Sequence, residues 1–587
     1  MQRIRERNQR VLEKERGTII KPWADRLRIV LVFPGTYRVG MANLGFQTVY
    51  RLFNEFNDVV CERAFYPEAQ ELSRHRKRGI PVLSLESSAP ISEFDIIAFS
   101  MPFENDLLIL LEMLSLSKIP LLASRRQKPA RKGFPLVMAG GIAVTLNPEP
   151  ASGFLDIAAI GEAEAIIPEF MPRILKARKS YRSPGGSGSK ARWLGALLDA
   201  PGIYIPRFYR VHYNQEGTIG GREALSGAPE RVARAFHKDL KGHSVRQILF
   251  APGIEFEDMG LIEISRGCGR ACRFCAEGYL LRPPRHRPSR EILDDIETLI
   301  EHREKIGLVA PVVPDYPMLV KILDFIKAKR AKVSVSSLRA DALPDTLLDA
   351  LADSGHQTLT LAPETGTERL RQVMNKPIPD REFLDAAWRI GRAGFRKLKL
   401  YFLVGLPTET RMDIEEIPVL IRKIMASLAM GSGKKRFPGE VHLSVNPFVP
   451  KPWTPFQWHP QESAKSLREK ISIIRDELRR NSGVKITAES PRQAEVQGLL
   501  SRGDRRLGPW LIKVLENQGN WARTVREEKI PLDFYLYRPR YEDEILPWNF
   551  LDVGVKREYL LEEYHRGLNK LLTPPCNPDK CRTCGVC

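Results

Sequence analysis

Three cysteines stand close together near the middle of the chain, at Cys268, Cys272 and Cys275. Their C-x3-C-x2-C spacing puts three thiols on one tight loop, directly after the strand-like run 261–265. Thiolate is the soft ligand that iron–sulfur clusters require, and a four-iron cluster with three protein ligands keeps one iron free for another molecule. Core packing or disulfide bonding explains the group poorly, because thiols this close in a reducing compartment are usually metal ligands. The spacing therefore predicts a reactive [4Fe-4S] cluster.

A second group of cysteines stands in the last twelve residues, with C-x4-C-x2-C-x2-C spacing: Cys576, Cys581, Cys584 and Cys587. Four thiolates complete the coordination of a metal, so the spacing predicts structural zinc or a second iron–sulfur cluster. Both alternatives stay open from the sequence. A cluster would deliver electrons or bind substrate, whereas zinc would fix the tail or grip nucleic acid.

The central motif and its position after a strand closely resemble the radical S-adenosylmethionine (SAM) superfamily. The resemblance implies that Cys268, Cys272 and Cys275 hold a [4Fe-4S] cluster whose unique iron binds the amino and carboxylate groups of SAM. It also implies reductive cleavage of SAM to a 5′-deoxyadenosyl radical, which removes hydrogen from an unactivated position. An electron donor of the flavodoxin or ferredoxin type is the implied partner.

Strand and helix signals alternate from residue 260 onward. Six strands are expected, at residues 261–265, 307–313, 332–336, 358–361, 397–404 and 440–445. Six βα units predict a partial (β/α)6 barrel of the TIM type, in which active residues sit at the C-terminal ends of the strands. The central cysteine motif falls at such an end, so its predicted position and its predicted chemistry agree.

The strand tips supply the candidate SAM contacts: Ser336, Arg339, Glu364, Thr365, Gly366, Gly405, Pro407 and Asn446. Among them, 364–366 resembles the fourth-strand segment that supports SAM in radical SAM enzymes, and 405–410 resembles the fifth-strand turn near adenine. A guanidinium at Arg339 would meet the SAM carboxylate or form a surface salt bridge. The usual second-strand GGEP motif is replaced by 312–317, where Asp315 or backbone carbonyls could accept from the SAM amino group.

The front of the chain also alternates. Strands are expected at 27–33, 96–100, 136–139 and 157–160, and helices at 45–56, 104–116 and 163–177. This order predicts an α/β, doubly wound, Rossmann-like domain with a parallel sheet.

The front domain resembles the cobalamin-binding domain that is fused to many radical SAM methyltransferases. The resemblance rests on 94–100, 138–149 and 156–164, and physically on glycines at strand ends, which let a backbone approach a bulky ligand. The candidate residues are Gly140, Gly141, Gly161 and Glu162. The histidine that usually binds cobalt is missing from 33–43. Cobalamin therefore binds without it, or the domain is a relic, a substrate platform or a fold with no ligand.

These signals divide the chain into five parts: a basic N-terminal arm (1–24), a cobalamin-binding-like Rossmann domain (25–182), a linker and connector (183–245), the partial barrel (246–460) and a smaller C-terminal domain with the four-cysteine site (461–587). With 587 residues and 43% hydrophobic content, the chain can form more than one core. The Gly- and Ser-rich run 183–189 is typical of a flexible linker.

The formal net charge of +20 makes an RNA substrate a candidate partner, because clustered basic residues attract phosphate. Three basic clusters stand at 125–132, 173–182 and 282–290, the last beside the cysteine loop. Each is alternatively a solvated surface. No apolar run reaches the roughly 18 residues of a membrane span, and the arginine-rich start does not resemble a signal peptide. The sequence predicts a cytoplasmic location and no membrane partner.

The segment 444–458 resembles the exit segment of methylthiotransferases and cobalamin-type radical SAM proteins. Its aromatics, Trp453, Phe456 and Trp458, line the substrate mouth or belong to the core. Taken together, the sequence predicts a radical SAM enzyme that carries out a methyl, methylthio or related modification of an unknown substrate, with nucleic acid as one candidate. Radical rearrangement or oxidation of a small molecule is the alternative chemistry. An iron–sulfur protein that binds nucleic acid without catalysis is the alternative class.

Overall fold

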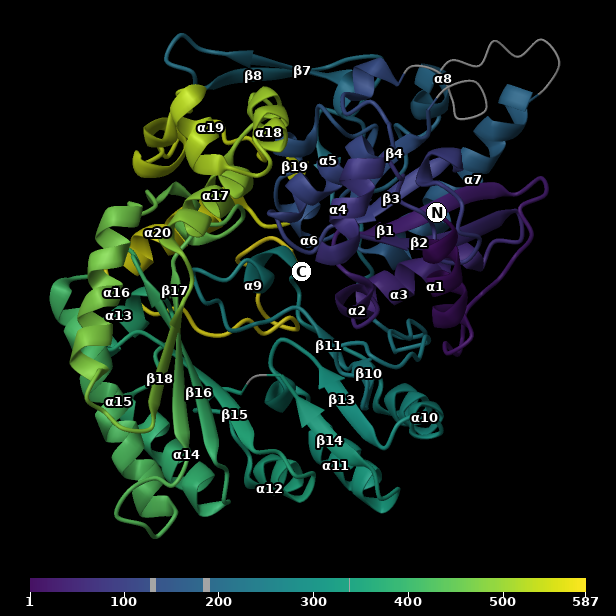
Figure 1. Cartoon of the computed structure of the whole chain (residues 1–587). Helices are drawn as coiled ribbons and strands as arrows, with labels where there is room; N and C mark the ends of the chain where they lie inside the picture. The colour runs from purple at the N-terminus through teal and green to yellow at the C-terminus, as the bar shows by residue number, and fades with distance from the viewer. Residues whose placement is uncertain (127–133, 183–189, 337, 587) are drawn as a thin grey trace.

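The structure is a computed structural model that describes residues 1–126, 134–182, 190–336 and 338–586. Two sets of parallel strands form its framework, one in the front domain and one in the barrel (Figure 1). The tail runs back between them, so that the C-terminus lies near the centre of the view beside α9.

The front sheet has the strand order β2-β1-β3-β4-β5-β6. Its strands are β1 (Leu27–Phe33), β2 (Val59–Phe65), β3 (Ile96–Ser100), β4 (Leu136–Gly140), β5 (Ile157–Ala159) and β6 (Ile203–Tyr204). The first five are parallel, and β6 runs antiparallel to β5. The predicted doubly wound α/β domain is confirmed.

Helices of this part are α1 (Gln2–Leu12), α2 (Tyr37–Gly40), α3 (Leu44–Asn54), α4 (Ala69–Arg78), α5 (Asp106–Leu116), α6 (Ile142–Leu146), α7 (Ala163–Arg182) and α8 (Lys190–Gly195). The N-terminal arm is helical only over α1. It is fixed to the front domain by Asn8, whose buried amide donates to the Ser84 carbonyl at 3.0 Å, and Arg16 forms a β-bridge with Phe250.

Sequence patterns explain which strands were predicted. The run of β1 is apolar and buried along almost its whole length, which is typical of a central parallel strand. The prediction missed β2 because Glu62 and Arg63 interrupt its apolar pattern, although both are buried. Arg63 is fully enclosed, with Glu15 and Glu86 each 2.7 Å away, so the buried charge has partners.

The barrel consists of two parallel sheets. One contains β10 (Met259–Glu263), β13 (Lys305–Val309) and β14 (Lys332–Val335), and the other β15 (Thr358–Glu364), β16 (Lys397–Val404), β17 (Glu440–Pro447) and β18 (Val484–Ala488). A parallel bridge between Leu338 and Leu361 joins them. All six predicted strands are present, and among the described residues the barrel stays open. The sheet also continues past residue 460, because β18 pairs with β17.

The barrel helices are α10 (Ser289–Ile300), α11 (Leu319–Ala328), α12 (Asp345–Asp353), α13 (Glu368–Val373), α14 (Asp380–Arg392), α15 (Arg411–Gly431) and α16 (Ala464–Leu478). Apolar side chains from most of them form one core with the strands. Figure 1 shows α14, α15 and α16 on the outer side of the second sheet.

The remaining elements tie the C-terminal region to the front domain. They are β7 (Tyr209–Tyr213), β8 (Ile219–Ala224), β9 (Val232–Ala233), β19 (Leu551–Asp552), α17 (Pro491–Arg502), α18 (Leu507–Glu516), α19 (Trp521–Glu527) and α20 (Arg557–Leu568). β9 pairs with β19, and Leu507, Trp548 and Leu551 belong to the front core. A 3-10 turn at Pro206–Phe208 separates β6 from β7. In the part of the chain that the structure describes, no helix is both long and apolar enough to cross a membrane.

Candidate active site and its cysteine loops

The central cysteine loop leaves the carboxyl end of β10 and is closed at its base by a short antiparallel pair, β11 (Ser265–Arg266) with β12 (Arg285–His286). One turn of helix, α9 (Glu277–Leu280), follows the last cysteine. Gly267 has a φ of +76°, and a Cβ there would lie 2.2 Å from the Leu281 carbonyl oxygen. Only glycine permits this close return of the loop.

Two arginines inside the motif hold the loop in place. Arg270 is paired with Asp315, its Nε donating at 2.9 Å, and its backbone N–H donates to Cys268 Sγ at 3.4 Å. Arg273 is fully buried and donates to the Val373 carbonyl at 3.0 Å and to Glu563 at 3.1 Å. Asp315 stands where the usual second-strand motif is replaced, and in this structure it positions the cysteine loop.

The thiols of the central motif are chemically suitable as cluster ligands. Burial raises the pKa of Cys268 to about 11 and that of Cys275 to about 12, so both would be neutral at ordinary pH without a nearby cation. Metal binding deprotonates such thiols. Within the described ranges, no three His, Cys, Asp or Glu side chains are already arranged around an ion position. Cluster ligation by these thiols therefore stays a prediction.

The predicted SAM contacts lie at the strand tips but meet different partners. Ser336 lines the large cavity described below. Arg339 is paired with Asp341, its Nη2 at 2.8 Å, and Glu364 is paired with Lys376 at 2.8 Å. Glu364 also has a positive φ of 67°, which is uncommon for a side chain other than glycine and often marks a functional position.

The other tip residues are explained by packing. A Cβ on Gly366 would lie 2.5 Å from the Ile417 backbone nitrogen, so this glycine allows α15 to approach. Gly405 donates its N–H to Glu409 at 2.9 Å. Thr365 is buried, and Asn446 is half-buried on β17. These residues, like Pro407, do not belong to the described wall of the large cavity. Their contact with SAM stays a prediction.

A cavity of about 1030 Å³ lies between the front domain and the barrel. On the front side its wall comes from α3 and from the carboxyl ends of β3, β4 and β5. On the barrel side it comes from the ends of β10, β13 and β14, together with Arg266, Glu277 and Leu281 around the cysteine loop. The carboxyl ends of the strands in two parallel sheets thus face one cavity. Both architectures bind ligands at these strand ends.

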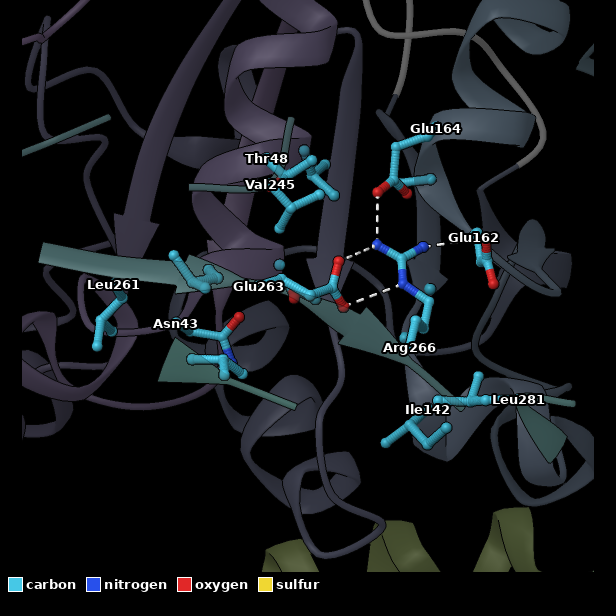
Figure 2. Close-up of a pocket in the computed structure, with 18 of the residues that line it drawn as sticks. Asn43, Thr48, Ile142, Glu162, Glu164, Val245, Leu261, Glu263, Arg266 and Leu281 are labelled. Atoms are coloured by element: carbon cyan, nitrogen blue, oxygen red, sulfur yellow. Dashed lines mark hydrogen bonds and ion pairs between the residues drawn. The ribbon is translucent and has the colours of Figure 1, made fainter. Parts of the chain in front are cut away.

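One arginine lies among three carboxylates in this wall (Figure 2). Arg266 reaches Glu162 at 3.0 Å, Glu164 at 2.8 Å and Glu263 at 2.8 Å. Arg285 is a second partner of Glu162, at 2.7 Å. Three carboxylates therefore share two guanidiniums, and the cluster connects the front domain to the base of the cysteine loop.

Glu277 follows the cysteine motif in the sequence. Its carboxyl lines the same wall. Burial and, second, the charge of Glu263 raise its pKa. The wall is therefore acidic as well as apolar, and it favours a neutral or positively charged ligand over a polyanion.

Three of the four residues predicted for the cobalamin-like site have a structural reason of their own. A Cβ on Gly141 would lie 2.6 Å from the Met101 carbonyl oxygen, and one on Gly161 would lie 2.1 Å from that of Ala235. Glu162 binds the two arginines. Gly140 lies at the end of β4, and all four residues line the cavity. No imidazole is among the described residues of the wall, so the thioethers of Met138 and Met259 are its softest donors.

Each basic cluster contains buried arginines, and the one beside the cysteine loop is mostly buried. In the cluster beside the cysteine loop, Arg282, Arg285 and Arg287 are buried. In the first cluster, Arg126 is fully buried and donates to Asp156 and to backbone carbonyls, while 127–133 lie outside the described residues. In the second, Arg178 is buried and donates to the Asp25 and Arg26 carbonyls. These arginines fix the fold and do not offer charge to RNA.

Two further predictions can be placed. Trp453, Phe456 and Trp458 are buried, so they belong to the core, and the interpretation as a substrate mouth is wrong. Of the C-terminal cysteines, Cys576 and Cys581 are partly buried and Cys584 is buried, whereas Cys587 lies outside the described residues. Their metal ligation stays a prediction.

Comparison with known proteins decides the family. Residues 45–206 match the family "Radical SAM proteins, N-terminal", and residues 262–420 match the Radical SAM superfamily. An uncharacterized protein of Methanocaldococcus jannaschii, MJ0966, is 30% identical over 502 residues, which cover 84% of this chain and 95% of that protein. The chain belongs to the radical SAM superfamily. It is a radical SAM enzyme, as the sequence predicts.

More distant similarities extend to enzymes of named activity. Ribosomal protein uS12 methylthiotransferase RimO of Thermosipho melanesiensis is 27% identical over 235 residues, which are 38% of this chain and 50% of RimO. Among solved structures, the radical SAM methyltransferase TsrM of Kitasatospora setae aligns with 93% of this chain and 98% of its own at 12% identity and a TM-score of 0.46. The cobalamin-dependent radical SAM enzyme OxsB aligns with 93% of this chain and 79% of its own, also at 12% identity, with a TM-score of 0.45.

Sequence reasoning named Glu162 only as a candidate ligand contact and missed its pairing with Arg266 and Arg285, which joins the two halves of this radical SAM enzyme. Arg266 stands directly before the cysteine motif, and Glu162 and Glu164 follow β5, yet no local pattern indicates that they meet. Their contacts span more than a hundred residues of sequence. The sequence did indicate that Glu162, Glu164 and Arg266 stand at the ends of predicted strands, where open α/β sheets bind ligands.

Proposed function

We propose that this radical SAM enzyme cleaves SAM reductively at a [4Fe-4S] cluster held by Cys268, Cys272 and Cys275, and uses the radical for a methyl- or methylthio-type modification of a substrate in the interdomain cavity. When bound, the cluster would supply one electron to SAM, and cleavage of the bond between C5′ and the sulfonium sulfur would give methionine and a 5′-deoxyadenosyl radical. A flavodoxin or ferredoxin provides that electron. The residues of the chain bind, orient and shield the reactants.

The single observation that carries the proposal is the position of the cavity. Arg266 precedes the first cysteine, Glu277 and Leu281 follow the last, and all three line the cavity. A radical generated at the loop would therefore form beside a cavity large enough to hold a substrate. Similarity to RimO over half of that protein supports the methyl or methylthio class.

The wall supports a substrate class different from RNA. Three carboxylates there share two guanidiniums, and the buried arginines beside the loop bond internally. A polyanion would be repelled from this wall, whereas the sulfonium of SAM and a neutral or cationic substrate would not. We therefore propose a small or locally uncharged target group. Radical rearrangement or oxidation of a small molecule remains the second candidate chemistry, because the same cavity suits it.

The front wall supports a corrinoid as an additional ligand. In the strand order 2-1-3-4-5 the topological switch point lies between β1 and β3, and the cavity is lined there by Leu31, Asn43 and Ser100. The donor set permits a corrinoid without a lower imidazole ligand, because no histidine is among the described wall residues. We expect a corrinoid bound in this way to show no imidazole-type spectral signature.

The activity test uses the full chain, reconstituted anaerobically with iron and sulfide, reduced with dithionite and supplied with SAM. We expect 5′-deoxyadenosine, measured by chromatography. Cys272→Ala should reduce it to background, whereas Cys61→Ala, which changes a buried cysteine in the front core, should retain it. If the protein with an intact cluster forms no 5′-deoxyadenosine, the proposal fails and the binding-protein alternative is favoured.

The corrinoid test is a spectral titration with hydroxocobalamin. Ala163 lines the cavity at the start of α7, so Ala163→Phe should weaken binding by filling the space. Ala165→Phe is the matched control, because Ala165 packs on the front core outside the cavity wall. Equal affinity in wild type and Ala163→Phe would place the corrinoid elsewhere and contradict this part of the proposal.

A further inference from the structure

The C-terminal tail carries four cysteines that the proposed radical chemistry does not use. We propose that Cys576, Cys581 and Cys584, with Cys587 as the fourth ligand given by the spacing, hold a second metal–thiolate centre. This centre lies against the radical SAM loop, and its negative charge is balanced by the buried Arg282. The inference goes beyond the proposed function and does not depend on it.

The start of the tail is bonded to the radical SAM loop itself. The Cys576 N–H donates to the Gly269 carbonyl at 2.7 Å, so the first tail cysteine is joined to the residue that follows Cys268. Further upstream in the tail, the Thr573 N–H donates to Asn375 Oδ1 at 2.9 Å. The Asn375 amide in turn donates to the Ala271 carbonyl at 3.2 Å. Two separate hydrogen-bond links thus fix the tail to this loop.

The far part of the tail is docked as well. Cys584 is only 3% exposed, and its carbonyl accepts from the Lys556 N–H at 2.9 Å. Gly585 has a φ of +91°, and a Cβ there would lie 2.8 Å from the Lys556 side chain. Cys584 is therefore buried in the molecule, and the tail returns to the neighbourhood of α9, as Figure 1 shows.

A buried cation supplies an independent indication of a bound anion. Arg282 is 2% exposed. Its Nε donates to the Gly278 carbonyl at 2.6 Å and its Nη1 to the Tyr559 hydroxyl at 3.2 Å, while its Nη2 is buried with no hydrogen-bond partner. No carboxylate among the described residues forms an ion pair with it. Cys581 and Cys584 are within its electrostatic reach.

An enclosed guanidinium with neither a counter-ion nor a full set of acceptors is costly in water-excluded surroundings. Four thiolates around zinc carry a net charge of about −2, and a cluster with four cysteine ligands is also an anion. Either centre would provide the missing charge and a sulfur acceptor for the free N–H groups. The described tail cysteines are not joined in disulfides, so their thiols are available as ligands.

The decisive experiment removes the first site. In the full chain carrying Cys268→Ala, Cys272→Ala and Cys275→Ala, we expect either about one zinc or about four irons with matching sulfide per protein. Elemental analysis and Mössbauer spectroscopy distinguish the two. Adding Cys581→Ser and Cys584→Ser should reduce the metal to background.

A folded triple variant without metal above background, with folding checked by circular dichroism, overturns the proposal. Because this variant cannot assemble the radical SAM site, failure of the SAM chemistry leaves the result unaffected. Conversely, a metal-binding tail says nothing in favour of SAM cleavage, so the two proposals stand or fall separately.

A second measurement tests Arg282. In the triple-cysteine variant, we expect Arg282→Met to lose metal to a chelator about ten-fold faster, since a charge-assisted hydrogen bond is removed. Arg282→Lys should restore most of the retention, because it keeps the charge. Arg502→Met is the control, because Arg502 is also a buried arginine with unpartnered nitrogens, and the charges that act on it most strongly are those of Arg540, Arg538 and Glu544. Equal rates in all three variants would overturn the role of Arg282.

Discussion

Two arginines close to the central cysteine loop, one half-buried and one buried, have opposite surroundings. Arg266, before the loop, is within 3.0 Å of each of three carboxylates. Arg282, after the loop, has none and retains an unpartnered nitrogen. Arg282 is 2% exposed and the Arg266 side chain is 13% exposed, so water can replace missing partners in full at neither site. The protein itself balances the first charge completely, whereas it leaves the second to a ligand.

This contrast separates a structural charge from a functional one. An arginine with its own carboxylates links elements and fixes the cavity wall whether or not a ligand is bound. An arginine without them is destabilising until an anion arrives, and such local conflicts are expected at functional sites. The three predictions below test the contrast, from the largest expected effect to the smallest.

Replacing Arg266 should have the largest effect. Arg266→Leu leaves Glu162, Glu164 and Glu263 with too few cations, so we expect the free energy of unfolding to fall by about 3–5 kcal/mol. Urea unfolding measures it. Arg266→Lys, which keeps the charge but loses the planar fork, should fall in between. A change below about 0.5 kcal/mol would show that this cluster does not support the interface.

A cluster with reversed charges sharpens the comparison. The carboxylate of Glu149 lies between Arg505 at 2.9 Å and Arg222 at 3.1 Å. Burial raises the pKa of Glu149, but the two arginines outweigh burial and lower it from 4.5 to about 2.

Because the folded pKa of Glu149 is the lower one, its contribution to stability is complete above pH 4.5 and is lost as the pH falls towards 2. Between pH 6 and pH 3.5, the wild type should lose about 1.4 kcal/mol more unfolding free energy than Glu149→Gln, the value of one pKa unit. Parallel urea titrations measure the difference. Identical slopes for the two proteins would contradict the assignment.

Replacing Arg282 in metal-free protein should have the smallest effect. A buried cation without a counter-ion contributes little, so Arg282→Met should change the unfolding free energy by no more than about 1 kcal/mol, and an increase is compatible with the argument. Thermal unfolding of the chelator-treated protein measures it. A loss as large as that of Arg266→Leu would mean that Arg282 already has its partners, and the contrast would disappear.

The fold could be predicted where the pattern is local. The apolar run of β1 and the strand β16 have the bounds that the sequence predicts, and three cysteines within eight residues indicate their chemistry directly. β18 was missed because it is short and alternates with exposed residues, which is a weak signal. The burial of β2 could not be predicted from its sequence, because it contains Arg63, whose partners Glu15 and Glu86 lie elsewhere in the chain.

The site could be predicted only in part, for a related reason. The glycines at 141 and 161 were interpreted as making room for a ligand, but their missing Cβ atoms make room for the backbone of Met101 and Ala235. Spacing cannot distinguish the two, because both require the same residue. Likewise, a basic sequence cluster indicates a binding surface only when it is exposed, and the tertiary fold buries most of the one beside the loop.

The hydrogen bond between Arg273 and the Leu571 carbonyl joins residues 298 positions apart, and the tail bond to Gly269 is of similar range. During synthesis, the segment bearing the three central thiols leaves the ribosome long before the segment that covers it. For that interval the nascent chain presents an open sulfur-rich surface, because N-terminal parts fold first. Iron delivery in the cell is thus best timed after release of the finished chain, and truncated translation products would expose reactive thiols to oxidation.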